Sequence, residues 1–66
     1  MIDYINVKEI NGGLVVEQYK LCSSLYIITR IEGKYRLYKI DEEGGNPKKI
    51  CESKNANDLH ERIPDY

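Results

Sequence analysis

Tyrosine, arginine and lysine side chains alternate with apolar ones in the central third of this 66-residue sequence. Because every second side chain of an extended strand points to the same side, two neighbouring strands here would share one mixed face. Its members are Tyr26, Ile28, Arg30, Tyr35, Leu37 and Lys39. Tyrosine and arginine dominate binding hot spots, since each covers a large area and keeps a polar group for hydrogen bonding. We expect this hairpin face to bind a partner.

A protein is the partner predicted first, and a nucleic acid is the alternative. Tyrosine rings interleaved with cations also suit stacking on bases, with Lys48 and Lys49 as further contacts. The same face could instead belong to the core, in which case Ile28 and Leu37 would pack inside, covered by the stems of the neighbouring cations. A homodimer formed through this face is compatible with either partner.

The other reactive residue types do not form a catalytic or metal-binding pattern. His60 is the only histidine, and a single histidine on a short helix is more often a surface residue than a general base. Cys22 and Cys51 lack the close spacing of zinc ligands, so we expect free thiols. The acidic run Asp41-Glu42-Glu43 is expected to be solvated. We therefore predict no enzyme activity, no metal and no cofactor.

The hairpin face requires a β-hairpin to position it. The apolar-rich runs 25–31 and 35–41 are joined through Glu32-Gly33, and glycine reaches the positive φ of a type I′ turn without a Cβ clash. Runs at 2–10, 14–21 and 48–52 predict three more strands, separated by glycine-rich turns. Strands that follow one another this closely form a five-stranded antiparallel meander.

A short helix is expected over residues 56–63. Asn55 is a good N-cap, Leu59 and Ile63 fall on one helical face with Ala56, and Pro64 ends the helix. A helix of about two turns is not stable alone, so it must dock on the sheet. We expect it to cover the opposite side of the hairpin and leave the hairpin face accessible. The predicted core under the helix consists of Leu25, Ile27, Tyr38, Ile40, Ile5, Val7 and Val16.

This order of elements (β-β-β-β-β-α) predicts a mainly β fold, a five-stranded antiparallel meander that strand twist curls into an SH3-like partly open barrel. The run from Gly33-Lys34-Tyr35 through Asp41-Glu42-Glu43-Gly44-Gly45 to the helix with Leu59 resembles the small archaeal 7-kDa chromatin proteins, which are chromodomain-like SH3-like barrels. The resemblance implies that fold. By position it also implies a face of Ile28, Arg30, Tyr35, Leu37 and Lys49. Those proteins are strongly basic and carry a tryptophan on this face, where the present chain has Arg30.

Composition restricts the class of protein further. A chain of 66 residues forms one domain, and 41% hydrophobic with 32% charged residues is typical of a globular protein. The formal net charge of −1 argues against a protein that coats nucleic acid generally. No signal peptide and no apolar run of about 20 residues is present, so we expect a cytoplasmic monomer or homodimer. Our hypothesis is a small regulator or inhibitor of the phage or mobile-element type.

Overall fold

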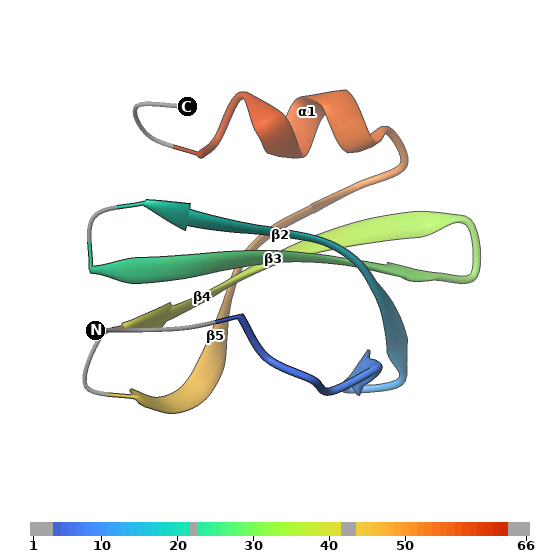
Figure 1. Ribbon diagram of the computed structural model, residues 1–66. Helices are drawn as coiled ribbons and strands as arrows, with labels where there is room; N and C mark the ends of the chain where they lie inside the picture. The colour runs from blue at the N-terminus through green and yellow to red at the C-terminus, as the bar shows by residue number, and fades with distance from the viewer. Residues whose placement is uncertain (1–3, 22, 42–43, 64–66) are drawn as a thin grey trace.

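The computed structural model describes residues 4–21, 23–41 and 44–63. Within these residues, five strands follow one another in the order β1-β2-β3-β4-β5, each antiparallel to the next. The elements are β1 (Glu9–Ile10), β2 (Gly13–Leu21), β3 (Ser24–Ile31), β4 (Lys34–Asp41), β5 (Gly44–Ser53) and the helix α1 (Ala56–His60). Figure 1 shows the sheet with α1 on one side and the N-terminal segment on the other. The predicted antiparallel meander with a C-terminal helix is confirmed.

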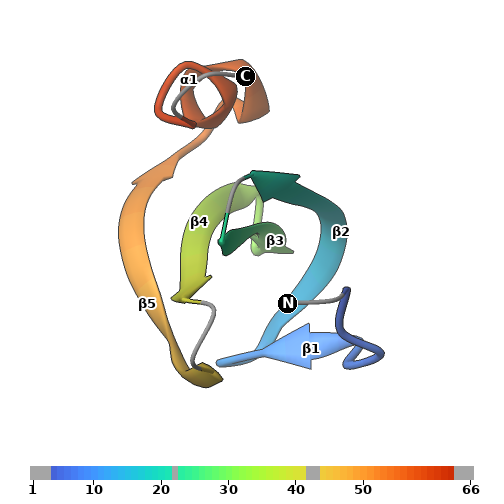
Figure 2. The same ribbon diagram turned by 60° about the vertical axis from the view of Figure 1, so that its left-hand side comes forward.

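The sheet is curled into a half-barrel. In Figure 2 the strands β2 to β5 arch over β1 and the N-terminal segment, while α1 lies on the outer side of the arch. Strand twist drives such curling, and bulges add to it. The ladder shifts register between Val15 and Glu17 in β2, and at two places where β4 meets β5. Because β1 and β5 stand at opposite ends of the strand order, the described barrel stays open between them.

The two tight turns use successive residues with positive φ. Asn11 and Gly12 connect β1 to β2 with φ of 50° and 86°, and Glu32 and Gly33 connect β3 to β4 with φ of 45° and 77°. Positive φ at both central residues is the pattern of a type I′ turn, whose twist matches that of the flanking strands. The turn predicted at Glu32-Gly33 is therefore confirmed.

The N-terminal strand is shorter than expected. A strand was predicted over 2–10, but only Glu9–Ile10 pairs with β2, and residues 4–8 hold no strand. Instead, the Gln18 side chain binds the backbone of Ile5 twice. The Ile5 N–H donates to Gln18 Oε1 at 2.9 Å, and Gln18 Nε2 donates to the Ile5 carbonyl at 3.1 Å. A side chain thus replaces the backbone ladder along this part of β2.

The C-terminal elements differ in length from their predicted bounds. The strand expected over 48–52 is longer, and the helix expected over 56–63 is α1, which ends at His60. Its N-cap is Asn55 as predicted, since the side chain accepts a hydrogen bond from the Asn57 N–H at 3.0 Å. After His60 the chain continues in turns whose N–H groups donate to carbonyls three or four residues earlier. These turns still bring Ile63 into the core.

The hydrophobic core is divided between the two faces of the sheet. The inner cluster, on the face turned away from α1, consists of Ile10, Leu25, Ile27, Tyr38 and Ile40, with Ile5 and Val15 packed against it. The helix cluster, under α1, consists of Tyr26, Ile28, Leu37, Leu59 and Ile63, with Tyr19, Leu21, Tyr35 and Cys51 at its margin. Because successive side chains of β3 enter alternate clusters, the stretch 25–29 is buried without interruption.

The predicted position of the helix is wrong. Leu59 and Ile63 pack in the helix cluster, on the hairpin face, and not against Leu25 and Ile27. Val7 and Val16 were expected in the core, but they are 54% and 45% exposed. Val16 is the unpaired residue of the bulge in β2, which shifts the alternation of side chains along that strand. Val7 lies in the segment that does not pair as a strand, so no neighbouring strand covers it.

Candidate functional site

Half of the hairpin face is buried beneath α1. Tyr26, Ile28 and Leu37 are 6%, 0% and 0% exposed and form the centre of the helix cluster. Tyr35 is half-buried at the margin of that cluster. A side chain without accessible surface cannot contact a partner. In this conformation, therefore, these three residues belong to the core. This is the alternative stated in the sequence analysis for the hairpin face.

Lys39 and Arg30 lie at the periphery of the hairpin face. The Lys39 Nζ atom is 5.9 Å from the centroid of the Tyr26 ring and 3.7 Å from Asp41 Oδ1. Its charge is therefore directed at groups of the same molecule. Arg30 is exposed, and its guanidinium makes no hydrogen bond or ion pair with the residues that the structure describes. Arg30 is thus an exposed member of the hairpin face that stays available to another molecule.

Arg30 occupies the middle of a row of side chains that runs across three strands. It lies directly opposite Leu14 of β2 and Tyr35 of β4, and directly opposite residues of antiparallel strands project from the same face. Leu14 is 49% exposed. We call Leu14, Arg30 and Tyr35 the Arg30 row. The sequence analysis missed Leu14, because its place depends on the register of β2 against β3, which a strand sequence alone does not specify.

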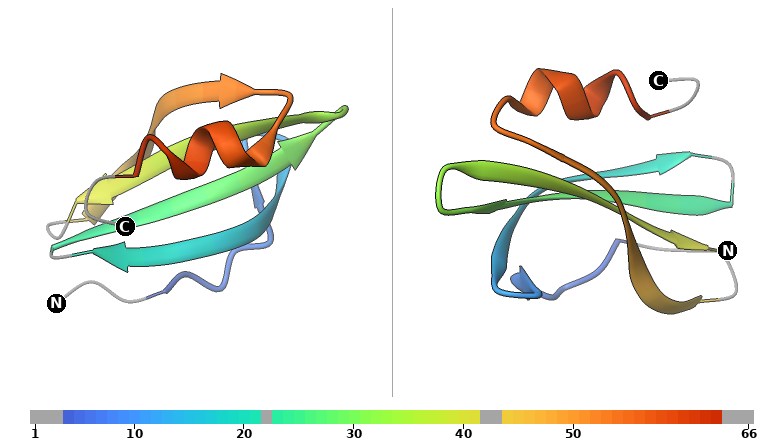
Figure 3. Two further views of the ribbon diagram at one scale, coloured as in Figure 1. Left: turned by 90° about the horizontal axis from the view of Figure 1, so that it is seen from above. Right: turned by 180° about the vertical axis from the view of Figure 1, so that it is seen from behind.

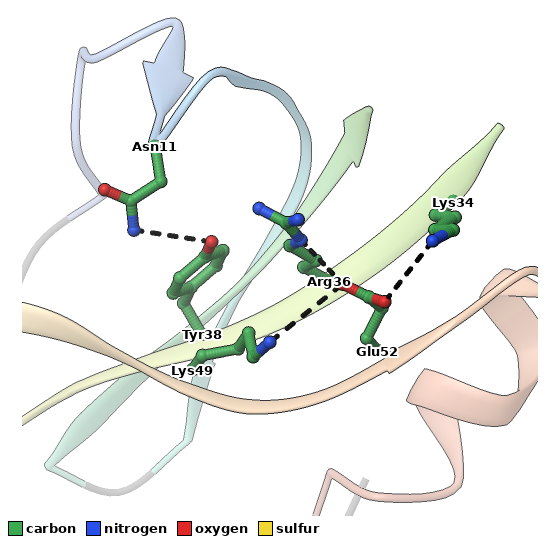
Figure 4. Close-up of polar contacts among 6 residues, drawn as sticks. All are labelled: Asn11, Lys34, Arg36, Tyr38, Lys49 and Glu52. Atoms are coloured by element: carbon green, nitrogen blue, oxygen red, sulfur yellow. Dashed lines mark hydrogen bonds and ion pairs between the residues drawn. The ribbon is translucent and has the colours of Figure 1, made fainter. Parts of the chain in front are cut away.

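A cluster of cations surrounds Glu52 on the inner face (Figure 4). Arg36 Nε donates to Glu52 Oε1 at 2.8 Å, and the Nζ atoms of Lys34 and Lys49 lie 3.9 and 4.0 Å from its carboxylate oxygens. The hydrogen bond from Arg36, aided by the nearby lysines, lowers the pKa of Glu52 below its ordinary value. The same hydrogen bond raises the pKa of Arg36. Three cations around one carboxylate leave this Glu52 cluster with a positive charge.

The two lysines predicted as nucleic-acid contacts lie on opposite faces of β5. Lys49 is opposite Tyr38 and belongs to the Glu52 cluster, whereas Lys48 is exposed and lies opposite Lys39 on the helix side. Tyr38 itself is buried, and its hydroxyl accepts a hydrogen bond from Asn11 Nδ2 at 3.4 Å (Figure 4). The structure therefore does not bring Lys48 and Lys49 together into one basic surface.

His60 lies in a polar cluster that joins α1 to β2. Its Nε2 atom is 3.3 Å from the Tyr19 hydroxyl and 3.2 Å from Glu17 Oε2, and Tyr19 donates its hydroxyl to Glu17. The rings of Tyr19 and His60 meet edge to face, with centroids 5.8 Å apart. These contacts attach the helix to the sheet. Sequence reasoning missed Glu17 and Tyr19, because only the docking of α1 brings them to His60.

Cys51 is a free thiol, half-buried at the margin of the helix cluster. Burial raises the pKa of this thiol, opposed by the charge of Arg62, so the unreactive protonated form predominates at neutral pH. Cys51 lines a cavity of about 220 Å³ together with Asp58, Glu61 and Arg62. Among the described residues, no group of three His, Cys, Asp or Glu side chains is placed to hold a metal ion. Cys22, Glu42 and Glu43 lie outside the described residues.

A groove of about 400 Å³ opens beside the N-terminal segment, at the open side of the half-barrel. Its apolar walls are formed by Ile5, Val7, Ile10, Ile40 and Pro47. Glu9 and Asn11 add polar groups to its rim. The groove therefore brings together the N-terminal segment and the region where β4 is followed by β5.

Within the part of the chain that the structure describes, no helix is long and apolar enough to cross a membrane. No protein-family model, no curated protein and no solved structure matches this chain. The resemblance to archaeal chromatin proteins therefore stays a prediction.

Proposed function

We propose that this chain is a non-catalytic binding module whose partner is a protein. The observation that supports this is the Arg30 row, in which an exposed guanidinium that has no partner among the described residues stands between Leu14 and Tyr35. Arginine and tyrosine beside accessible apolar area match the composition of hot spots in protein interfaces. The row lies on paired strands, so its side chains are positioned by rigid elements. The proposed interface is thus the exposed end of the hairpin face, extended by Leu14.

The distribution of cations favours a protein over a nucleic acid. Lys34, Arg36 and Lys49 surround a carboxylate on the inner face, whereas Arg30 and Lys48 lie on the helix side. Tight binding to a phosphate backbone needs several free cations on one surface. The formal net charge of −1 adds to this argument. Nucleic acid is therefore the alternative outcome of the test.

Affinity capture from cells that encode the chain tests the proposal. We expect the same protein to be enriched by the wild-type chain and by Lys8→Glu, and lost with Arg30→Glu or with Leu14→Ser combined with Tyr35→Ala. Lys8→Glu is the matched control, since Lys8 is an exposed cation in the N-terminal segment and is not a member of the row. Circular dichroism of each variant checks that the fold is intact.

Two results would contradict the proposal. Capture that survives Arg30→Glu would place the interface elsewhere. Capture that disappears after nuclease treatment would favour nucleic acid, and a salt titration would then measure a log–log slope of about one per phosphate contact.

A further inference from the structure

We propose that the outer edge of β5 accepts an extended acidic segment of a partner as an additional strand of the sheet. β5 is the last strand in the sheet order, and in the described structure it pairs only with β4. Figures 2 and 3 show no described element beyond its outer side. The free side of an edge strand presents N–H and C=O groups that can bind another strand.

Charge identifies the kind of strand that fits. Lys49 belongs to the positively charged Glu52 cluster on the inner face, and Lys48 projects on the helix side. Lys48 lies directly opposite Lys39, and two like charges in such a pair destabilise a sheet. Both sides of this edge are therefore positive. Carboxylates at alternating positions of an added strand share one face, and on the inner face they would meet the positive charge of the Glu52 cluster.

The other edge of the sheet is protected in a different way. There the edge strand β1 is only two residues long, and beyond it the Gln18 side chain of β2 binds the backbone of Ile5 and attaches the N-terminal segment to β2. β5 instead carries two lysines and a bulge at Ile50, the residue that has no partner between Cys51 and Lys49. The two lysines discourage an identical chain from adding to the edge, because two copies would bring them together. They do not repel an acidic segment, and Ile50, 44% exposed, offers it an apolar contact.

This surface differs from the Arg30 row, so the inference goes beyond the proposed function and either can fail alone. The test uses the full chain, labelled with ¹⁵N, and a peptide of about six residues that alternates glutamate and valine. We expect saturable shifts and slowed hydrogen exchange of the amides in 48–53. A glutamate–valine peptide that is N-methylated at every residue keeps its charge but presents no N–H group on either edge, so it cannot form the strand ladder and should not bind. A lysine–valine peptide should not bind either.

Charge reversal on the protein supplies the matched pair of variants. Lys49→Glu is expected to weaken binding of the glutamate–valine peptide about fivefold, as estimated from the strength of exposed ion pairs. Lys54→Glu makes the same change of charge just beyond β5, and it should alter the affinity by less than about twofold. Arg30→Glu should leave peptide binding unchanged even where it abolishes capture of the cellular partner.

Several outcomes would overturn the inference. Equal binding of the N-methylated peptide would show charge attraction without strand pairing. Shifts confined to the Arg30 row would place the acidic segment on that surface. Protection of 48–53 that grows with protein concentration in the absence of peptide would identify a second copy of the chain as the occupant.

Discussion

The two faces of the sheet are both apolar, but they are closed by different means. On the helix face, Leu59 and Ile63 of the C-terminal region cover the middle of the hairpin. On the inner face, the curvature of the sheet brings Ile10 of β1 over Leu25 and Ile27, and the N-terminal segment adds Ile5. The sheet is therefore the middle layer of a small molecule, and its central hairpin is core on both sides. Accessible binding surface is left at the ends and edges of the strands.

The faces also differ in how their polar groups are satisfied. On the helix face, Glu17, Tyr19 and His60 contact one another. On the inner face, Thr29 is completely buried, and its Oγ1 atom has no hydrogen-bond partner among the residues that the structure describes. The backbone of Gly13 lies so close to Thr29 that a Cβ there would be 2.9 Å from that oxygen. On the inner face, the backbone of β2 therefore packs directly against a side chain of β3. On the helix face, polar side chains connect the helix to the sheet.

The largest predicted effect tests whether both faces are core. Ile27 and Ile28 are adjacent in β3 and both are 0% exposed, one in each cluster. Truncating either to alanine should lower the free energy of unfolding by about 2–5 kcal/mol, as expected for buried isoleucine. Urea denaturation followed by circular dichroism measures this change.

Controls are needed because a domain this small is only marginally stable. Ile→Val at the same two positions should cost about 0.5–1.5 kcal/mol and leave folded protein to measure. Ile50→Ala, at a position 44% exposed, should change stability by less than about 0.5 kcal/mol. If Ile28→Ala lowered the free energy of unfolding as little as Ile50→Ala, α1 would not cover the hairpin face in solution.

An intermediate effect is predicted for the close packing of the inner face. Gly13→Ala places a Cβ 2.9 Å from Thr29 Oγ1 and 3.1 Å from Thr29 Cβ, and overpacking of this kind costs about 1–3 kcal/mol. Thr29→Ala removes the nearer atom, so the double variant should be more stable than the sum of the two single effects predicts. Additive losses in thermal or urea unfolding would show that the backbone relaxes away from Thr29.

The smallest predicted effect concerns the Glu52 cluster. The hydrogen bond from Arg36 lowers the pKa of Glu52 in the folded state, so its stabilising contribution is present above the unfolded-state pKa. That contribution is lost as the pH falls through the lower folded-state value. In Arg36→Gln, an NMR titration of the Glu52 carboxyl should show its pKa raised toward the ordinary value. Lys54→Gln is the control, and an unchanged titration in Arg36→Gln would contradict the assigned cause.

The order of the elements could be predicted because it depends on local signals. Glu32-Gly33 specifies a turn, and Asn55 marks the start of a helix, whatever the rest of the chain does. The face covered by the helix could not be predicted, since residues 25–40 carry apolar side chains on both faces. The alternation of side chains along the strands therefore does not indicate which face the helix covers. For the same reason half of the hairpin face, Tyr26, Ile28 and Leu37, was predicted as binding surface although it is core. Arg30 remains exposed because it lies at the end of its strand, beyond the buried stretch.

The hydrogen bonds between Gln18 and Ile5 give the N-terminal segment a stability of its own. One side-chain amide supplies both a donor and an acceptor to the backbone of Ile5, as a neighbouring peptide group would. Because residues 4–8 are attached to the sheet without a strand ladder, they can open locally while β2 to β5 remain paired. Such an opening would remove Ile5 and Val7 from the wall of the groove and uncover the inner cluster. Removal of the Gln18 amide is therefore expected to speed hydrogen exchange at the Ile5 N–H.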